Sequence, residues 1–265
     1  MLAGRKDRAM SKIVKGAASF AVLLAAWQVL ALSGLFPASL FPSPVAVAAA
    51  LAERAASGQL VLDIGASMYR FLIGYVLACA SAVLLGLVMG WCTRAWEFLN
   101  PIVQFLRPIS PVAWLPFIVL WLGIGDIPAI VVIFLAAFFP VLLSTVSAVR
   151  RIDPVYLKVS RNFGLTSAAT LLKVVLPASF PVIANALHIA LGTAWIFLVA
   201  GEMAGTQSGL GFLIVDARNN LRADDLLAAI VVIGVLGVLL DWVIKQFESD
   251  VNRIWGTGGA EGGRA

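Results

Sequence analysis

Long apolar runs separated by short charged segments are the main pattern along this chain. Because about 20 apolar helical residues cross the hydrocarbon core of a bilayer, these runs predict six membrane-spanning helices. The predicted spans are 17–36, 71–93 with a start near 64, 98–122, 127–149, 174–201 and 226–240, the last extending toward 247. The third span is interrupted by Arg107. The pattern therefore predicts an all-α membrane protein.

The composition agrees with this fold class. Hydrophobic residues make up 61% of the 265 residues and charged residues 12%, against about 25% charged residues in a typical soluble domain. A single globule cannot bury that much apolar surface, so we expect lipid around the chain. The net charge of +5 is explained by membrane topology and does not indicate nucleic-acid binding.

The distribution of charge orients the spans. Most of the 19 Lys and Arg residues fall on one side if the chain crosses six times, and the opposite loops hold only Arg54, Arg218 and Arg222. The positive-inside rule makes the basic side cytoplasmic. We therefore predict a cytoplasmic N-terminus at 1–15, a transmembrane domain at 16–250 and a flexible, glycine-rich tail at 251–265, with both termini cytoplasmic. A cleaved signal peptide is disfavoured because 17–36 is long for its apolar core.

Two polar segments carry helix start and stop signals. Ser43 and Pro44 predict the cap and first residue of a short helix on the outer membrane face. In the cytoplasmic segment 150–177, Asp153 followed by Pro154 predicts a helix start, and Gly164 suits the left-handed residue that ends it. Further along this segment, Thr166 predicts the cap of a second short helix that runs toward Leu176, before Pro177 at the entrance to span five.

The first of these cytoplasmic helices carries one apolar row. Val155, Val159 and Phe163 recur at i, i+4 and i+8 and so share one face. Such a row outside the membrane fits either the groove of a partner protein or the inner membrane surface. The spacing alone does not decide between them.

The second half of this segment resembles the cytoplasmic signature of ABC importer permeases. In that signature a glycine is followed by nine residues, an aliphatic residue, one more residue and Leu-Pro, and "GLTSAATLLKVVLP" from Gly164 to Pro177 meets the spacing. The chain departs from the signature at Lys158-Val159-Ser160, where the family has Glu-Ala-Ala. The resemblance implies that 153–173 forms coupling helices that dock on an ATP-binding subunit. The residues it assigns to this coupling are Asp153, Val155, Val159, Ser160, Phe163, Gly164, Leu165, Thr166, Leu176 and Pro177.

A second resemblance concerns the branch of the family. "RPISPVAWLPFIVLWLGIGD" at 107–126, "LVAGEMAGTQSGLGFLI" at 198–214 and "FPSP" at 41–44 are similar to permeases for nitrate, taurine, alkanesulfonates and bicarbonate. It implies the type I importer (MetI-like) fold, the bacterial inner membrane, and a small anionic solute delivered by a periplasmic binding protein. Related permeases for thiamine-type pyrimidine precursors carry similar segments, so that solute class stays open.

Span three and two charged residues indicate a translocation pathway. Pro101, Pro108, Pro111 and Pro116 break span three and free carbonyls that must avoid lipid. Arg107 at the break either lines the pathway or snorkels to the cytoplasmic interface. A half-helix beginning near Ser110 would favour an anion. Trp114 and Trp121 lie seven residues apart on one side of a helix, a spacing more typical of packing or of the lipid interface than of a ligand site. Glu202 either pairs with Arg70 or with backbone amides at an outer gate, or faces water at the interface.

The remaining chemistry argues against an enzyme. The single histidine, His188, lies in an apolar run and suits an interhelical hydrogen bond better than a metal site. We therefore assign no catalytic and no metal-binding residue, and a secondary transporter without an ATPase remains the alternative class.

The chain has no glycine-rich phosphate loop, so ATP and Mg²⁺ would bind to partner subunits. The resemblance implies a homodimer in contact with membrane lipid, two ATP-binding subunits and a solute-binding protein. Gly74, Gly86 and Gly90 predict close helix packing, within the bundle or across the dimer.

Overall fold

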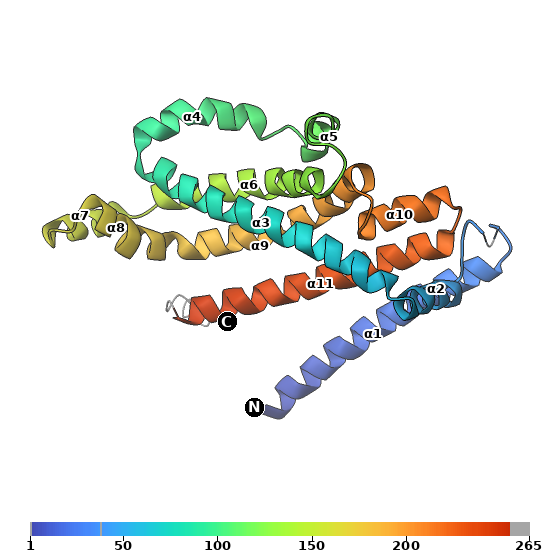
Figure 1. The fold of residues 1–265 in the computed structure, drawn as a ribbon. Coiled ribbons are helices and arrows are strands. Elements are labelled where there is room, and N and C mark those ends of the chain that lie inside the picture. Colours follow the sequence, from blue (N-terminus) through green and yellow to red (C-terminus); the bar gives the residue numbers. More distant parts are fainter. Residues whose placement is uncertain (1, 38, 255–265) are drawn as a thin grey trace. The chain divides into compact units, whose positions relative to one another are not determined.

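The protein is described here by a computed structural model that covers residues 2–37 and 39–254, with side chains at 14–16, 18–37 and 39–246. Within this part of the chain the fold is almost entirely helical and contains no strand (Figure 1). The elements are α1 (Leu2–Leu32), α2 (Pro44–Ala56), α3 (Gln59–Trp91), α4 (Thr93–Leu106), η1 (Pro111–Trp114), α5 (Leu115–Leu122), α6 (Asp126–Arg150), α7 (Pro154–Asn162), α8 (Ser167–Thr170), η2 (Leu171–Val175), α9 (Leu176–Gly205), α10 (Leu210–Asn219) and α11 (Ala223–Ile254). Of the tail predicted at 251–265, the first four residues extend α11 and 255–265 lie outside the described residues.

Among the described residues, five helical segments are long and apolar enough to cross a membrane: Val14–Leu32, Gln59–Trp91, Asp126–Arg150, Ser167–Gly205 and Ala223–Gln246. The sixth predicted span is a bent pair, α4 followed by η1 and α5, with an angle of 83° between its halves. The pattern of six spans is therefore confirmed if this pair is counted as one broken span. Spans two, five and six are longer than predicted because the helices continue into the residues that flank the apolar runs.

The bend in the third span lies where the prolines predicted a break. α4 ends at Leu106, and Pro108 and Pro111 each lack the N–H group that would continue its hydrogen-bond ladder. Pro101 and Pro116 lie within helical segments and do not cause the bend. The interruption at Arg107 is confirmed, and the halves form a sharp corner.

The chain divides into two compact units. The first comprises Met1–Leu62 and Leu213–Val232. Within it, the Ser43 hydroxyl accepts a hydrogen bond from the Ala46 amide at 3.2 Å, and Pro44 begins α2, which confirms the predicted cap.

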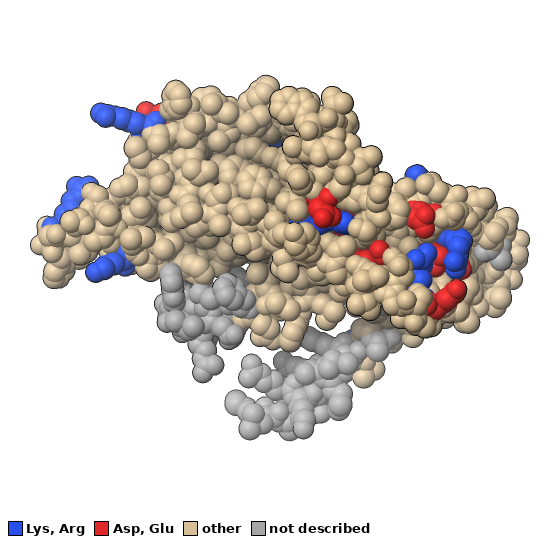
Figure 2. All heavy atoms as spheres, viewed as in Figure 1, with Lys and Arg blue, Asp and Glu red and all other residues tan. Residues whose placement is uncertain are grey.

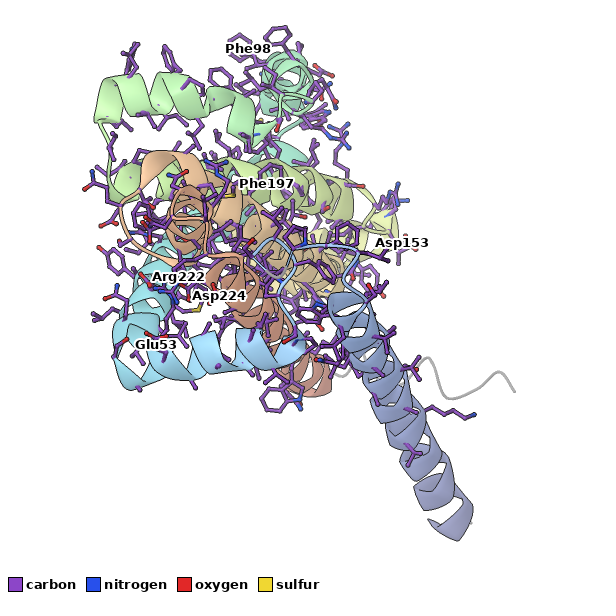
Figure 3. The ribbon with its side chains drawn as sticks, turned by 90° about the vertical axis from the view of Figure 1, so that its right-hand side faces the viewer. Glu53, Phe98, Asp153, Phe197, Arg222 and Asp224 are labelled. Carbon is purple, nitrogen blue, oxygen red and sulfur yellow. The ribbon has the colours of Figure 1, made fainter. Side chains whose placement is uncertain are left out.

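An ion cluster ties α2 to the start of α11 in this first unit. The Arg54 guanidinium donates two hydrogen bonds of 2.8 Å to the buried carboxylate of Asp225. Arg222 lies 3.0 Å from the same carboxylate, and Figure 3 shows Arg222 close to Glu53 and Asp224. A bidentate pair fixes geometry as well as charge, so α2 is held in one orientation on α11.

The second unit, Asp63–Phe212 and Ile233–Ala265, contains the main core. α3, α6 and α9 pack together around buried residues such as Phe71, Ile133, Val141 and Leu198. The rings of Phe71 and Trp195 meet edge to face with centroids 5.3 Å apart. α6 and α9 approach closely through small residues, since the Cα of Ala129 lies 3.1 Å from where a Cβ on Gly201 would stand.

The glycines of α3 allow its contact with α6. A Cβ on Gly74 would stand 2.9 Å from the Ile133 side chain, and one on Gly90 would stand 2.6 Å from the Cβ of Val149. The predicted packing role of the glycine spacing is confirmed within the bundle.

We predict that Gly86→Ala destabilises the protein. The new methyl group would stand 2.6 Å from the Cβ of Thr145 on α6, so the two helices must separate. Overpacking of this kind costs about 1–3 kcal/mol. The measurement is the thermal unfolding midpoint of the purified protein in detergent.

Gly65→Ala is the matched control on the same helix. No atom lies within 4 Å of its added Cβ, and replacing glycine by alanine inside a helix stabilises it by roughly 1 kcal/mol. Equal midpoints for the two variants would contradict the packing role of Gly86.

Candidate functional site

The segment after α6, which the charge distribution predicts to be cytoplasmic, forms the capped helix that its sequence predicted. The Asp153 carboxylate accepts a hydrogen bond from the Val155 amide at 2.8 Å, and Pro154 begins α7. Gly164 ends the turn with φ of +70°, a conformation that L side chains rarely adopt. The Thr166 hydroxyl accepts a hydrogen bond from the Ala169 amide at 3.3 Å. These local signals are confirmed.

The second helix of this segment differs from its prediction. It is not a separate short helix, because α8 passes through the π-helical turn η2 directly into α9. Pro177 is the second residue of α9 and directly follows the π-helical turn. Gly164 is thus followed by one continuous helical stretch that leads into span five.

α7 has an inner and an outer face. Leu157 on α7, and Ile152 just before this helix, pack against a cluster formed by Leu87, Val149 and Val175, at the ends of α3, α6 and η2. Ser160 is buried and its hydroxyl donates to the Tyr156 carbonyl at 2.7 Å. The inner face therefore fastens α7 to three helical segments.

The outer face carries the predicted apolar row. Val155, Val159 and Phe163 are 58%, 46% and 81% exposed. Of the other residues assigned to coupling, Asp153, Gly164 and Thr166 are also exposed, Leu165 is half-buried, and Ser160 and Leu176 point inward. Figure 2 shows Lys and Arg side chains at the end of the second unit where α7 lies, with few charges over the spanning helices.

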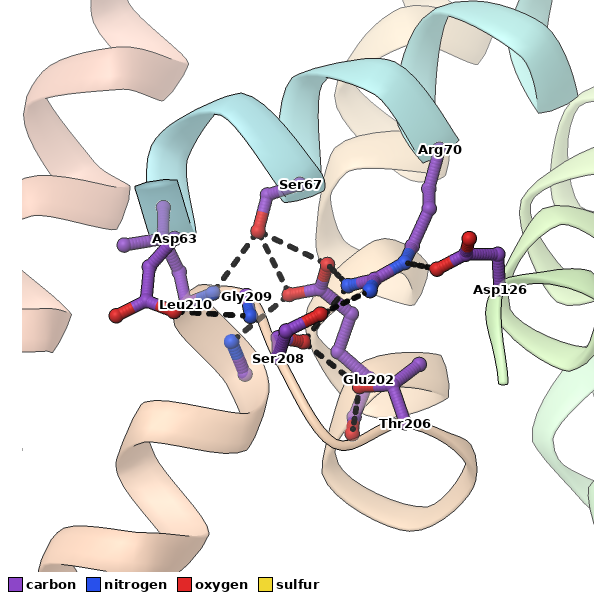
Figure 4. A network of polar contacts seen from close by, with 10 residues as sticks. Asp63, Ser67, Arg70, Asp126, Glu202, Thr206, Ser208, Gly209 and Leu210 are labelled. Carbon is purple, nitrogen blue, oxygen red and sulfur yellow. Dashed lines mark hydrogen bonds and ion pairs between the residues drawn. The ribbon is translucent and has the colours of Figure 1, made fainter. Parts of the chain in front are cut away.

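A buried polar cluster joins α3, α6 and α9 (Figure 4). Arg70 is 2% exposed and Glu202 is 0% exposed, and their side chains form an ion pair of 2.7 Å. Arg70 also donates to Asp126 at 2.7 Å and to the carbonyl and hydroxyl oxygens of Ser208 at 2.7 and 2.5 Å. The guanidinium thus connects two helices and the loop after α9.

Both oxygens of the Glu202 carboxylate accept hydrogen bonds. Oε1 accepts from Arg70 and from the Ser67 hydroxyl, which also lies 2.8 Å from Oε2. Oε2 in addition accepts from the Gly211 amide at 2.9 Å. Such a set of donors compensates the loss of water around a buried charge.

The loop after α9 is shaped around this carboxylate. Gly209 has φ of +99°, and a Cβ at this position would collide with the Glu202 carboxylate and the Arg70 guanidinium. The Gly209 amide donates to Asp63 at 3.2 Å and the Leu210 amide donates to Ser67 at 2.9 Å. The backbone of this loop therefore covers the Arg70–Glu202 ion pair.

The cluster decides between the two alternatives for Glu202. Glu202 pairs with Arg70 and with a backbone amide, as one alternative stated, and does not face water as the other did. Asp63 and Asp126 belong to the same network, and the sequence analysis assigned neither of them to a site. Asp126 lies just before the predicted span 127–149, and its spacing from Arg70 in the sequence does not indicate their contact.

The other predicted pathway residues lie elsewhere in the second unit. Arg107 is exposed and lines a pocket between α4 and α6. Ser110 is exposed at the start of η1 and makes no capping hydrogen bond through its side chain. Trp114 lines a separate apolar pocket of about 270 Å³ between α5 and α6. Of the five predicted pathway residues, only Arg70 and Glu202 therefore lie together. The role of each of the five in a pathway stays a prediction.

His188 makes the interhelical contact that was expected. Its Nε2 lies 2.8 Å from a carboxylate oxygen of Asp241 on α11, whose other oxygen accepts from Lys245 at 2.6 Å.

Comparison with known proteins decides the family. A family model described as "Binding-protein-dependent transport system inner membrane component" matches residues 82–253. The chain belongs to this family. The permease is therefore an inner membrane component of an ABC transporter.

Three relatives place the permease in a branch of the family. SsuC of Bacillus subtilis (strain 168), named for aliphatic sulfonate transport, is 33% identical over 89% of this chain and 85% of the relative. The taurine transport system permease protein TauC of Escherichia coli (strain K12) is 32% identical over 87% and 86%. The nitrate import permease protein NrtB of Synechocystis sp. is 33% identical over 90% and 89%.

The fold agrees with this assignment. A solved structure of the MetNI methionine ABC transporter in an inward facing conformation matches with a TM-score of 0.65 over 74% of this chain and 97% of that chain, at 21% identity. The permease has the MetI-like importer fold that the sequence predicted.

We predict that Glu202→Gln strongly destabilises the permease. Each carboxylate oxygen faces donors, so the amide NH₂ of glutamine would face another donor in either orientation. Removing one partner of a buried ion pair costs about 3 kcal/mol or more. The measurement is the thermal unfolding midpoint in detergent.

Asp126→Asn is the matched control, because Asp126 pairs with the same guanidinium but its side chain is 53% exposed. An exposed ion pair contributes at most about 1 kcal/mol. A loss of stability as large as that of Glu202→Gln would contradict the assignment of the buried pair as the stronger contact.

Proposed function

We propose that the permease forms half of the translocation pathway of an ATP-driven importer, with a second copy forming the other half. Two ATP-binding subunits on the cytoplasmic side hydrolyse ATP with Mg²⁺, and a periplasmic binding protein delivers the solute. In this orientation both termini and α7 lie in the cytoplasm. The family and its relatives support the class of transporter, and the charge distribution supports the orientation.

The observation that carries the coupling role is the two-faced α7. Its inner face packs on α3, α6 and η2 through Leu157, with Ile152 of the preceding turn in the same cluster, whereas its outer side exposes Val155, Val159 and Phe163. An amphipathic helix with an exposed apolar row fits the groove of a partner protein. Closure of the ATP-binding subunits would then push α7, and the packed inner face would pass the movement to the spans.

The solute we propose is a small oxyanion: an aliphatic sulfonate or taurine, or nitrate or bicarbonate. The names of three relatives, which cover most of the chain, support this class. A thiamine-precursor-type pyrimidine is the competing solute class within the same family.

The coupling role predicts that Phe163→Asp releases the ATP-binding subunit. The ring is 81% exposed, so its burial would come from the partner, and an interface anchor of this kind is worth about 2 kcal/mol, or roughly thirtyfold in affinity. The measurement is the affinity of the ATP-binding subunit for the detergent-purified permease, together with the ATPase activity of the complete transporter in liposomes.

Two variants serve as controls for this experiment. Asn162→Asp adds the same charge at the neighbouring exposed residue without removing apolar surface, and Phe163→Leu keeps an apolar side chain. Both should retain the complex. Intact binding by Phe163→Asp would contradict the proposed docking surface, and solute transport by the permease alone in liposomes would favour a secondary transporter.

The solute class is tested separately with the complete transporter in liposomes and its binding protein. We expect labelled taurine, an alkanesulfonate, nitrate or bicarbonate to be taken up with ATP. Uptake of a pyrimidine precursor and of none of the anions would contradict the oxyanion assignment while leaving the permease assignment in place.

A further inference from the structure

A basic groove runs between α4 and α6, apart from the buried Arg70–Glu202 cluster. The pocket has a volume of about 390 Å³, and its polar lining comes from both helices and the residues that follow them. We call it the α4–α6 groove and define it by Trp96, Gln104, Arg107, Ser147, Arg150 and Arg151. Since α4 rises about 1.5 Å per residue, Trp96 and Arg107 mark ends roughly 16 Å apart.

Within the described part of the chain, no side chain neutralises the three guanidinium groups of the groove. Among the side chains at 14–16, 18–37 and 39–246, no carboxylate forms an ion pair with Arg107, Arg150 or Arg151. The only acidic residue of α4, Glu97, is exposed and makes no such pair. The Arg150 guanidinium lies over the Trp96 ring, 5.9 Å from its centroid. Like charges that share one pocket repel one another, so a bound anion would stabilise them.

The helix that forms one wall carries a row of polar residues near the groove and exposed phenylalanines on another face. Asn100, Gln104 and Arg107 follow one another at helical spacing, and the Gln104 amide donates to the Asn100 carbonyl oxygen at 3.2 Å. Phe98 and Phe105 are 77% and 72% exposed on a different face of α4, and Figure 3 shows Phe98 on this helix. Within a membrane protein, polar side chains of this kind border protein or water and not acyl chains.

We propose that the α4–α6 groove is a binding site for an oxyanion. The Arg guanidinium groups present paired N–H donors that match the oxygens of a sulfonate, sulfate or phosphate group. The Gln104 amide and the Ser147 hydroxyl supply further donors. The volume is that of a small-ligand pocket. The site does not depend on which solute the transporter imports.

The anion could come from two sources that share this chemistry. One is a free oxyanion in solution at the cytoplasmic mouth of the permease. The other is the phosphate of an anionic phospholipid, because basic pockets between helices on the cytoplasmic side bind such headgroups. The experiment below separates the two.

The full-length permease is placed in nanodiscs of phosphatidylcholine, and binding of [³⁵S]sulfate is measured at constant ionic strength against chloride. We expect saturable binding, weakened about tenfold or more by Arg107→Gln and by Arg150→Gln, because each removes a charge-assisted hydrogen bond. Arg107→Lys should bind with intermediate affinity, since it keeps the charge and loses the paired donors.

Arg94→Gln is the matched control: it removes the same charge from an exposed residue of α4 that does not line the groove. It should bind sulfate as the unaltered permease does. The thermal unfolding midpoint of each variant shows whether it is folded, and we expect little change because all of these side chains are exposed.

A second arm uses nanodiscs that contain phosphatidylglycerol and counts the anionic lipid retained after purification. Sulfate binding that depends on Arg107 and Arg150 identifies a free oxyanion site. Lipid retention with the same dependence, without sulfate binding, identifies a headgroup site. If neither ligand binds, or if Arg94→Gln weakens binding as much as Arg107→Gln, the oxyanion site is wrong.

Discussion

A polar group within a membrane protein must find its partners inside the protein or in trapped water, and this constraint shapes the second unit of the permease. Arg70 and Glu202 meet it by pairing with each other and by drawing in Ser67, Ser208 and the Gly211 amide. The same requirement explains the backbone of the loop after α9, where glycine lets the amides approach the carboxylate. The cluster therefore fixes the relative positions of α3, α6 and α9 at one end of the core.

Close packing also holds α3, α6 and α9 together along their length. Gly74, Gly86 and Gly90 let α3 lie directly on α6, and Ala129 meets Gly201 between α6 and α9. Helices in such contact cannot slide without steric conflict, because interiors packed to this density are not continuously deformable. Movement at α7 would therefore act on α3, α6 and α9 together, as the coupling role proposed for α7 requires.

Local signals in the sequence predicted local structure well, and long-range contacts less well. Asp153 and Gly164 act through neighbouring backbone groups, so their roles as cap and helix end could be read from the sequence. The pairing of Glu202 with Arg70 was foreseeable as one alternative, because few charged residues lie in the predicted spans. The part played by Asp126 and the 83° corner of the third span depend on three-dimensional packing, which residue spacing does not contain. The sequence did not predict that α8 continues into α9, because the residues that join them form the irregular, π-helical turn η2.

α6 extends from the buried Arg70 at one end to the arginines of the α4–α6 groove at the other. Its first residue, Asp126, accepts a hydrogen bond from the buried Arg70, and its last residue, Arg150, lines the α4–α6 groove together with Arg151. With 25 residues, α6 spans about 37 Å. Arg70 is fully compensated by protein groups, whereas the groove arginines have no carboxylate partner among the described side chains. Because α7 begins at Pro154, four residues after α6 ends, the movement proposed for α7 would reach the groove before it reached the buried cluster. An anion in the groove would therefore lie beside the short segment that joins α6 to α7.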